Sequence, residues 1–433
     1  MQANRESQPL GPEESGIGFQ GPRAAPLARG PDHGLLHEMF EERVADRPRA
    51  PAVAVGREAT SYAGLDRYAN RLARHLWGLG VRRGARVGIL LPHSVDAYAA
   101  ILGVLKAGAA CVPIDPHVRA GHVVRVLEDS EASVLVTTTE HARRRAGFRG
   151  QVLELDARRG AIAAESPIPL QARAEPGDLC CVFYTVDASG QRKGVMVEHG
   201  GASHLVRTCA RLFGIRPWDR VYQGSALSAC ESLLEVWLAL HAGATLVPRL
   251  PETGRLARLL VRARVTVMSC TPAFLAALRH DVPPLRLLIL SAGTCPRYLI
   301  DRWSRADRRL VSIYGHAETA MIATYADLLP RGPVTAGRPL PGCRVYVLDN
   351  DLRLAKYGHV GEICVGGVGI ARGYLGLPAE TRARFVPDPF APRELGGARV
   401  YLTGDLGRIN ASGELELHGR AAWARAWPRG HGS

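Results

Sequence analysis

Lysine is scarce in this sequence of 433 residues. Only Lys106, Lys193 and Lys356 contribute to a Lys+Arg total of 55, so arginine supplies nearly all the positive charge. A formal net charge of +14 is compatible with an acidic partner such as nucleic acid. The arginines are scattered, however, and a GC-rich coding bias explains them more simply in a chain rich in alanine and glycine. We therefore expect no nucleic-acid partner.

Two further features that the sequence lacks are a cysteine framework and a long apolar run. The nine cysteines show no C-x-x-C spacing and lie mostly in apolar runs, which predicts reduced, mostly buried thiols and no zinc site. The apolar runs are too short or too interrupted to span a bilayer, and the first residues form no apolar signal core. With 46% hydrophobic and 22% charged residues, the composition predicts a globular, cytoplasmic protein without a membrane partner.

The pattern of apolar residues changes along the chain. Residues 1–32 are rich in proline, glycine, arginine and glutamate and have no apolar periodicity, which predicts a disordered leader. Residues 35–44 then place apolar side chains on one helical face, and 51–55 form a short predicted strand. An amphipathic helix is expected over 68–79 and a buried strand over 84–91. This alternation of helices and strands favours an α/β fold with parallel pairing.

A small polar loop with a lysine near its end lies at 184–194 (YTVDASGQRKG). An apolar run at 179–183 leads into the loop and another at 195–199 leads out, a pattern typical of strand, loop, strand. Such a loop can turn backbone N–H groups and the Lys193 ammonium towards phosphates. A hairpin that carries one exposed lysine is the structural alternative.

This loop resembles the phosphate loop of the adenylate-forming superfamily, which includes adenylation domains of nonribosomal peptide synthetases, acyl-CoA synthetases and luciferases. The resemblance implies that Thr185, Ser189, Gly190 and Lys193 contact the phosphates of ATP, with Lys193 catalytic. The loop departs from the family pattern most sharply at Asp187, where the family has glycine. A carboxylate and a Cβ there would oppose close approach of the triphosphate.

Further motifs follow in the order that the superfamily shows. Residues 105–116 (LKAGAACVPIDP) are nearly letter for letter the peptide-synthetase pattern, and 361–375 also match. In 312–319 (SIYGHAET) the resemblance implies that Tyr314 stacks by the adenine beside Gly315. It also implies that Glu318 is a catalytic residue that holds Mg²⁺. His316 and Ala317 replace the proline and threonine of the family there.

The ribose site is expected from the end of the pattern. Residues 401–406 (YLTGDL) are intact, and the resemblance implies that Asp405 accepts hydrogen bonds from the ribose hydroxyls. Arg420 is the last shared landmark and joins the expected nucleotide site. We expect 421–433 to be a truncated tail, with Ala422 at the hinge position, because neither the family's C-terminal domain nor its lysine follows.

The acid pocket is placed by counting back from Gly243. The aspartate that grips a substrate ammonium in the family falls on Cys230, with Glu231 next to it. Two interpretations stay open: the substrate lacks an α-amino group (a hydroxy, keto, aryl or β-amino acid), or the pocket is derelict. The resemblance places the pocket wall at Cys230, Glu231, Leu234, Ser291, Gly293, Ile313, Met321 and Ile322.

Together the motifs predict an α/β adenylation core over 33–420, with two large α/β subdomains and a small β-barrel. The implied reaction is ATP-dependent activation of a carboxylic acid as an acyl-adenylate in nonribosomal peptide synthesis, with ATP and Mg²⁺ as cofactors. A carrier protein and an MbtH-like helper are the implied partners. The alternatives are a degenerate adenylation-like domain that acts as a binding scaffold or is a gene remnant, and an activity like that of acyl-CoA synthetases.

Overall fold

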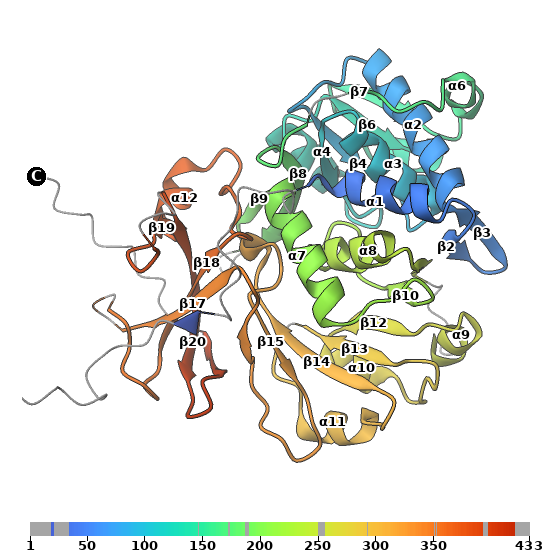
Figure 1. The fold of residues 1–433 in the computed structure, drawn as a ribbon. Helices are drawn as coiled ribbons and strands as arrows, with labels where there is room; N and C mark the ends of the chain where they lie inside the picture. The colour runs from blue at the N-terminus through green and yellow to red at the C-terminus, as the bar shows by residue number, and fades with distance from the viewer. Residues whose placement is uncertain are drawn as a thin grey trace, which may run out of the picture.

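The computed structural model describes residues 19–20 and 34–420, apart from 146, 172–173, 187–189, 250–255, 292, 350, 352 and 393–396. Three sheets organise this part of the chain (Figure 1). Two large sheets carry helices on their faces, and a smaller antiparallel sheet, orange to red in the figure, lies beside them. The expected fold class is confirmed by this arrangement.

The first large sheet has the strand order β7-β6-β4-β5-β8-β9. Its strands are parallel except for the antiparallel pair β8–β9. The strands are β4 (Arg86–Ile89), β5 (Ala110–Pro113), β6 (Val134–Thr137), β7 (Gln151–Glu154), β8 (Leu179–Val186) and β9 (Arg192–Glu198). The helices that accompany them are α2 (Tyr62–Gly78), α3 (Val95–Lys106), α4 (Ala120–Asp129), α5 (Thr139–Ala142) and α6 (Arg159–Ala164), with the 3₁₀ turn η1 (Arg143–Arg145).

The second large sheet has nine strands in the order β16-β15-β14-β13-β12-β10-β11-β2-β3. They are β2 (Pro51–Val55), β3 (Glu58–Ser61), β10 (Arg220–Gln223), β11 (Thr245–Pro248), β12 (Val267–Cys270), β13 (Leu287–Leu290), β14 (Arg309–Tyr314), β15 (Thr324–Asp327) and β16 (Arg338–Pro339). The helices are α1 (Leu36–Asp46), α7 (His199–Leu212), α8 (Glu231–Ala242), α9 (Leu256–Arg262), α10 (Pro272–Ala277) and α11 (Arg297–Trp303). Figure 1 shows α7 and α8 between the two large sheets, and the main apolar cluster includes side chains from both.

The small sheet is antiparallel throughout. It contains β1 (Phe19–Gln20), β17 (Cys343–Leu348), β18 (Gly361–Gly367), β19 (Phe385–Pro387), β20 (Arg399–Ile409) and β21 (Leu415–Arg420), and α12 (Pro378–Arg384) precedes β19. The sequence predicts disorder over 1–32, yet Phe19–Gln20 pairs with Val345 and Arg344 of β17. The rest of that predicted leader, and the predicted tail at 421–433, lie outside the described residues.

Local signals set the helix boundaries better than apolar periodicity alone. The helix expected over 68–79 begins earlier, at Tyr62, and ends at Gly78. Ser61 caps it, because its side chain accepts a hydrogen bond from the Gly64 N–H at 3.1 Å. Tyr62 and Leu65 in the added turn are fully buried. The expected strand at 84–91 is shorter in the structure and covers Arg86–Ile89.

Two buried ionic groups stabilise the large sheets. The Lys106 side chain is 3% exposed and pairs with Glu41 and, at 2.9 Å, with Asp66. Asp219, just before β10, is fully buried and accepts hydrogen bonds from Arg286 Nε at 2.8 Å and Thr266 Oγ1 at 2.8 Å. The Arg216 N–H donates to it at 2.7 Å. Asp219 therefore ties the start of β10 to the segments that precede β12 and β13.

The cysteines agree with the expectation of reduced thiols. All nine are free; seven are buried, and Cys230 and Cys270 are partly exposed. None of the described helices is both long and apolar enough to cross a membrane.

Candidate functional site

A cavity of about 770 Å³ lies between the end of β14 and strands β20 and β21. Its lining includes all four residues that the resemblance assigns to nucleotide recognition outside the phosphate loop: Tyr314, Gly315, Asp405 on β20 and Arg420 on β21. Ile313 and Gly293 of the expected acid pocket line it as well. The structure thus brings together residues about 100 positions apart in the sequence at one site.

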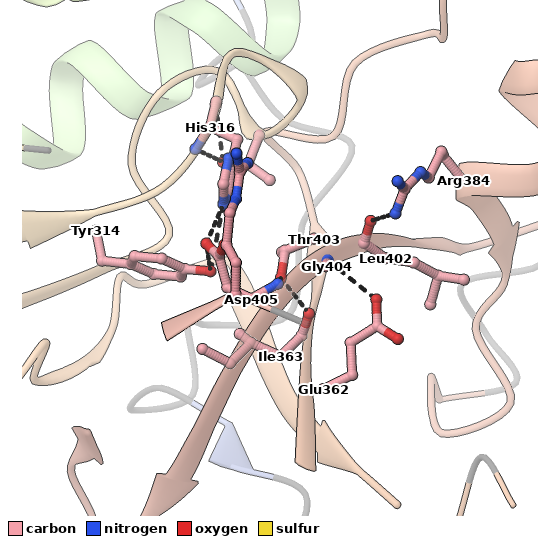
Figure 2. Close-up of polar contacts among 11 residues, drawn as sticks. Tyr314, His316, Glu362, Ile363, Arg384, Leu402, Thr403, Gly404 and Asp405 are labelled. Atoms are coloured by element: carbon pink, nitrogen blue, oxygen red, sulfur yellow. Dashed lines mark hydrogen bonds and ion pairs between the residues drawn. The ribbon is translucent and has the colours of Figure 1, made fainter. Parts of the chain in front are cut away.

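Asp405 is the most heavily hydrogen-bonded of these residues (Figure 2). Its Oδ2 accepts from Tyr314 Oη at 3.0 Å and from His316 Nε2 at 3.0 Å, and its Oδ1 accepts from Arg420 Nε at 3.0 Å. Burial opposes ionisation, but the hydrogen bonds and charge of His316, followed by those of Arg420 and Tyr314, hold the pKa of Asp405 below its usual value. Asp405 is therefore an ionised acceptor at neutral pH.

The neighbouring strand β18 fixes the turn that presents Asp405. The Thr403 hydroxyl donates to the Ile363 carbonyl at 2.7 Å and accepts from the Asp405 N–H at 3.0 Å. The Gly404 N–H donates to Glu362 Oε1 at 3.0 Å, as Figure 2 shows. Gly404 has φ of 76°, a left-handed conformation that favours glycine. The Thr-Gly-Asp order is thus needed to aim the carboxylate.

The turn after β14 carries the second half of the site. The 3₁₀ segment η2 (Ala317–Thr319) contains Glu318, and the next residues, Ala320 and Met321, have φ of 48° and 90°. Such positive φ values are costly for residues with a Cβ and persist only where the surroundings enforce them. The Met321 N–H closes the turn by donating to the His316 carbonyl at 2.7 Å.

Gly315→Ala is expected to weaken ATP binding by about tenfold, or about 1.4 kcal/mol. A Cβ on residue 315 would lie 2.3 Å from the Met321 carbonyl oxygen, so the turn that holds Glu318 must shift. Calorimetric titration with Mg²⁺ and ATP measures the effect. Gly160→Ala in α6, where nothing lies within 4 Å of the added Cβ, is the matched control. An unchanged affinity in the Gly315 variant would contradict the role of this turn.

Glu318 and Lys193 both contact Tyr374, a residue that the sequence analysis did not assign. The Tyr374 hydroxyl donates to Glu318 Oε1 at 2.9 Å, and Lys193 Nζ lies 5.2 Å from the centre of the Tyr374 ring. Burial, and then the Glu318 charge, raise the pKa of Tyr374, so the phenol keeps its proton. The sequence feature that could have pointed to Tyr374 is its place in the Gly-Tyr pair near the end of the matched motif at 361–375.

The segment expected to be the phosphate loop has the predicted order of strand, loop and strand, but the loop is shorter than the predicted 184–194, because β8 runs to Val186 and β9 begins at Arg192. Thr185 on β8 and Lys193 on β9 are paired across the two strands, and Gly190 has φ of 82°. Neighbouring strand residues point to opposite faces, so Arg192 contacts His122 of α4 while Lys193 lies over Tyr374. Ser189 and Asp187 lie outside the described residues, so the expectations for those two positions stay predictions.

The expected acid pocket begins at the N-terminus of α8, where Cys230 is the cap residue. Cys230 Sγ lies 3.5 Å from Glu231 Oε2. Burial raises the pKa of the Cys230 thiol, and the charges of Glu231 and Glu318 raise it further, so the thiol is neutral. Of the other expected wall residues, Leu234 and Ile322 are fully buried, and Ser291, Ile313 and Met321 are nearly so.

The sequence analysis also missed Glu235, one turn further along α8. It is buried and accepts hydrogen bonds from the Ser225 hydroxyl at 3.0 Å and the Ser225 N–H at 3.1 Å. Burial raises the pKa of Glu235 to about 8. The sequence feature that could have pointed to Glu235 is its position as an acidic residue inside the apolar run of α8.

The described residues contain no group of three or more histidine, cysteine, aspartate or glutamate side chains that could hold a metal by themselves. Mg²⁺ does not need such a group, because it is commonly held by one or two carboxylates together with substrate phosphates. Glu318 supplies one hard carboxylate beside the phosphate-loop lysine, so the residues present fit a nucleotide-bound Mg²⁺.

Comparison with known protein families agrees with this geometry. The family profile of AMP-binding enzymes matches residues 40–375. The chain belongs to the AMP-binding enzyme family. Among its relatives within the family, phosphinothricin tripeptide synthetase PhsC of Streptomyces viridochromogenes is 39% identical over 408 residues. Tyrocidine synthase 1 of Brevibacillus parabrevis is 32% identical over 396 residues.

The chain covers only part of these AMP-binding relatives. The PhsC match takes in 92% of this chain and 37% of PhsC, and the tyrocidine synthase 1 match takes in 89% and 36%. A solved structure of the nonribosomal peptide synthetase FmoA3 in its AMPPNP-bound form superposes with a TM-score of 0.81 at 33% identity. That superposition covers 89% of this chain and 42% of FmoA3.

Proposed function

We propose that this chain binds ATP with Mg²⁺ and activates a carboxylic acid as its acyl-adenylate, as a step in nonribosomal peptide synthesis. The observation that carries the proposal is the ionised Asp405 at a cavity of about 770 Å³, beside Tyr314. Glu318 and Lys193 meet nearby through Tyr374. The AMPPNP-bound form of FmoA3 and the peptide synthetases among the relatives support the same reaction.

In this proposal, different residues of the chain bind the ribose, the adenine and the phosphates of ATP. Asp405 and Tyr314 line the cavity, where Asp405 would accept hydrogen bonds from the ribose hydroxyls and Tyr314 would lie beside the adenine. Thr185, Gly190 and Lys193 would contact the phosphates, and Glu318 would hold Mg²⁺. A carboxylate oxygen of the substrate attacks the α-phosphorus, the bond from that phosphorus to the bridging oxygen breaks, and pyrophosphate leaves. Mg²⁺, when bound, neutralises charge on the phosphate oxygens.

The pocket wall favours an apolar acid without an ammonium group next to its carboxyl. A neutral thiol at Cys230 cannot pair with a substrate ammonium as a carboxylate would. Leu234, Ile313, Met321 and Ile322 give the wall an apolar character. Hydroxy, keto, aryl and β-amino acids therefore form the first set for an acid-dependent ATP–pyrophosphate exchange screen.

Two partners follow from the same proposal. The acyl group of the adenylate passes to a carrier-protein thiol, and AMP leaves. An MbtH-like protein is the second expected partner. The cytoplasm, which supplies ATP, is the expected location of the reaction.

Lys193→Met is expected to raise the dissociation constant for ATP about tenfold, because it removes the loop cation that faces the phosphates. Calorimetry with and without Mg²⁺ measures this constant. Lys356→Met is the matched control, because it makes the same chemical change on an exposed loop residue away from the cavity.

Absence of ATP binding by the wild-type chain at millimolar nucleotide would contradict the proposal and favour the binding-scaffold alternative. Equal loss of affinity in the Lys193 and Lys356 variants would show that net charge, and not contact with the phosphates, determines the effect.

A further inference from the structure

The carboxylate assigned to the ribose already has three donors of its own. Tyr314 Oη and His316 Nε2 both lie 3.0 Å from Asp405 Oδ2, and Arg420 Nε lies 3.0 Å from Oδ1. His316 Nε2 also lies 3.3 Å from Tyr314 Oη, so the side chains of Asp405, Tyr314 and His316 all contact one another (Figure 2). A nucleotide that uses Asp405 must share it with these donors or displace them.

The three donors differ in how easily they leave. The Arg420 side chain is 66% exposed and can turn to solvent at little cost. The His316 side chain is only 17% exposed. Its ring is edge-on to Tyr314, with centroids 5.5 Å apart, and lies 5.8 Å from the ring centre of Tyr401.

The backbone of His316 is held as well. Its N–H donates to Thr319 Oγ1 at 3.0 Å. Its carbonyl accepts from the Thr319 N–H at 2.9 Å and from the Met321 N–H at 2.7 Å. His316 is therefore a fixed donor to Asp405, whereas Arg420 is an exchangeable one.

We propose that His316 competes with the ribose of the nucleotide for Asp405, and that this competition sets how strongly the site selects for ribose hydroxyls. The inference rests on the proposed function, because it assumes that the cavity binds ATP. His316 is a specificity-determining residue in this proposal and takes no part in the chemical step.

The physical reason is the exchange of one donor for another. A hydroxyl that binds a carboxylate without partners gains a full charge-assisted hydrogen bond. A hydroxyl that replaces the imidazole N–H gains only the difference between two such bonds, and the displaced donor must find another partner. The ribose hydroxyls should consequently add little affinity while His316 is present and more once its donor is removed.

The test compares ATP with 2′-deoxy-ATP and 3′-deoxy-ATP, each with Mg²⁺, by calorimetry. The deoxy penalty is the dissociation constant of the deoxy nucleotide divided by that of ATP. We expect a penalty of at most about threefold in the wild type. We expect it to reach about tenfold or more in His316→Phe, which keeps an aromatic ring beside Tyr314 and Tyr401 but has no ring N–H. ATP itself should bind the variant several-fold more tightly.

His418→Phe is the matched control. His418 lines the same cavity, and its Nε2 lies 3.9 Å from Glu416 Oε2. Whatever this change does to the affinity for ATP, it should leave the deoxy penalty at its wild-type value. A penalty that rises equally in both variants would overturn the assignment to His316.

The outcomes separate this inference from the proposed function. A wild-type penalty above about tenfold refutes the competition without any variant, and so does an unchanged or smaller penalty in His316→Phe. Absence of ATP binding by both proteins refutes the proposed function and this inference with it, whereas ATP binding with an unchanged penalty refutes the inference only.

Discussion

Glu318→Gln is expected to lower the rate of acid-dependent ATP–pyrophosphate exchange by about 10³-fold. The amide cannot supply the negative charge that, in the proposed function, would hold Mg²⁺. It keeps an oxygen that accepts the hydrogen bond from Tyr374, which is 2.9 Å long in the wild type, so the turn around η2 should stay folded. The exchange rate with saturating ATP, followed over a range of Mg²⁺ concentrations, measures the loss.

A second carboxylate-to-amide change serves as the control for Glu318. Glu198 pairs with Arg372 at 2.8 Å in a partly exposed ion pair outside the cavity, so Glu198→Gln should change the exchange rate less than about threefold. If Glu318→Gln retained a tenth or more of the wild-type rate, Glu318 could not be the residue that holds the metal.

Asp219→Ala is expected to lower the free energy of unfolding by about 3–5 kcal/mol. The change removes the fully buried carboxylate that accepts from Arg286 and Thr266, and it leaves the Arg286 guanidinium without its ionic partner. Urea denaturation measures the loss as a lower midpoint at an unchanged slope.

An exposed pair of the same chemistry is available as the control for Asp219. Asp327 accepts two hydrogen bonds from Arg309, at 2.5 and 3.1 Å, but its side chain is 45% exposed. Asp327→Ala should therefore cost less than about 1 kcal/mol. Equal losses in the two variants would mean that burial is not what makes the Asp219 pair important.

Much of the site was open to prediction because its signals are local. The strand, loop and strand around Lys193 has an apolar run on each side, and the structure places Thr185 and Lys193 opposite each other. The Thr-Gly-Asp turn at Asp405 needs a glycine with positive φ, and the sequence has one at Gly404. Short motifs of this kind specify backbone conformation directly.

The contacts between motifs were not open to prediction from one sequence. Tyr374 and Glu318 are 56 residues apart, and His316 and Asp405 are 89 residues apart. No local pattern states which side chains meet when β14 and β20 come together. The pairing of Phe19–Gln20 with β17 was missed for a related reason, because a two-residue strand has no periodicity of its own.

The buried ion pair of Lys106 has a consequence for mapping the site by chemical labelling. Amine-acylating reagents act on accessible lysines, and the Lys106 side chain is only 3% exposed and pairs with Glu41 and Asp66. Lys193 and Lys356 are then the two lysine side chains open to the reagent in the folded chain. A bound nucleotide would shield Lys193 from the reagent and leave Lys356 open to it. The ratio of the modified Lys193 peptide to the modified Lys356 peptide in a mass spectrum would then report nucleotide occupancy, with Lys356 as the internal standard.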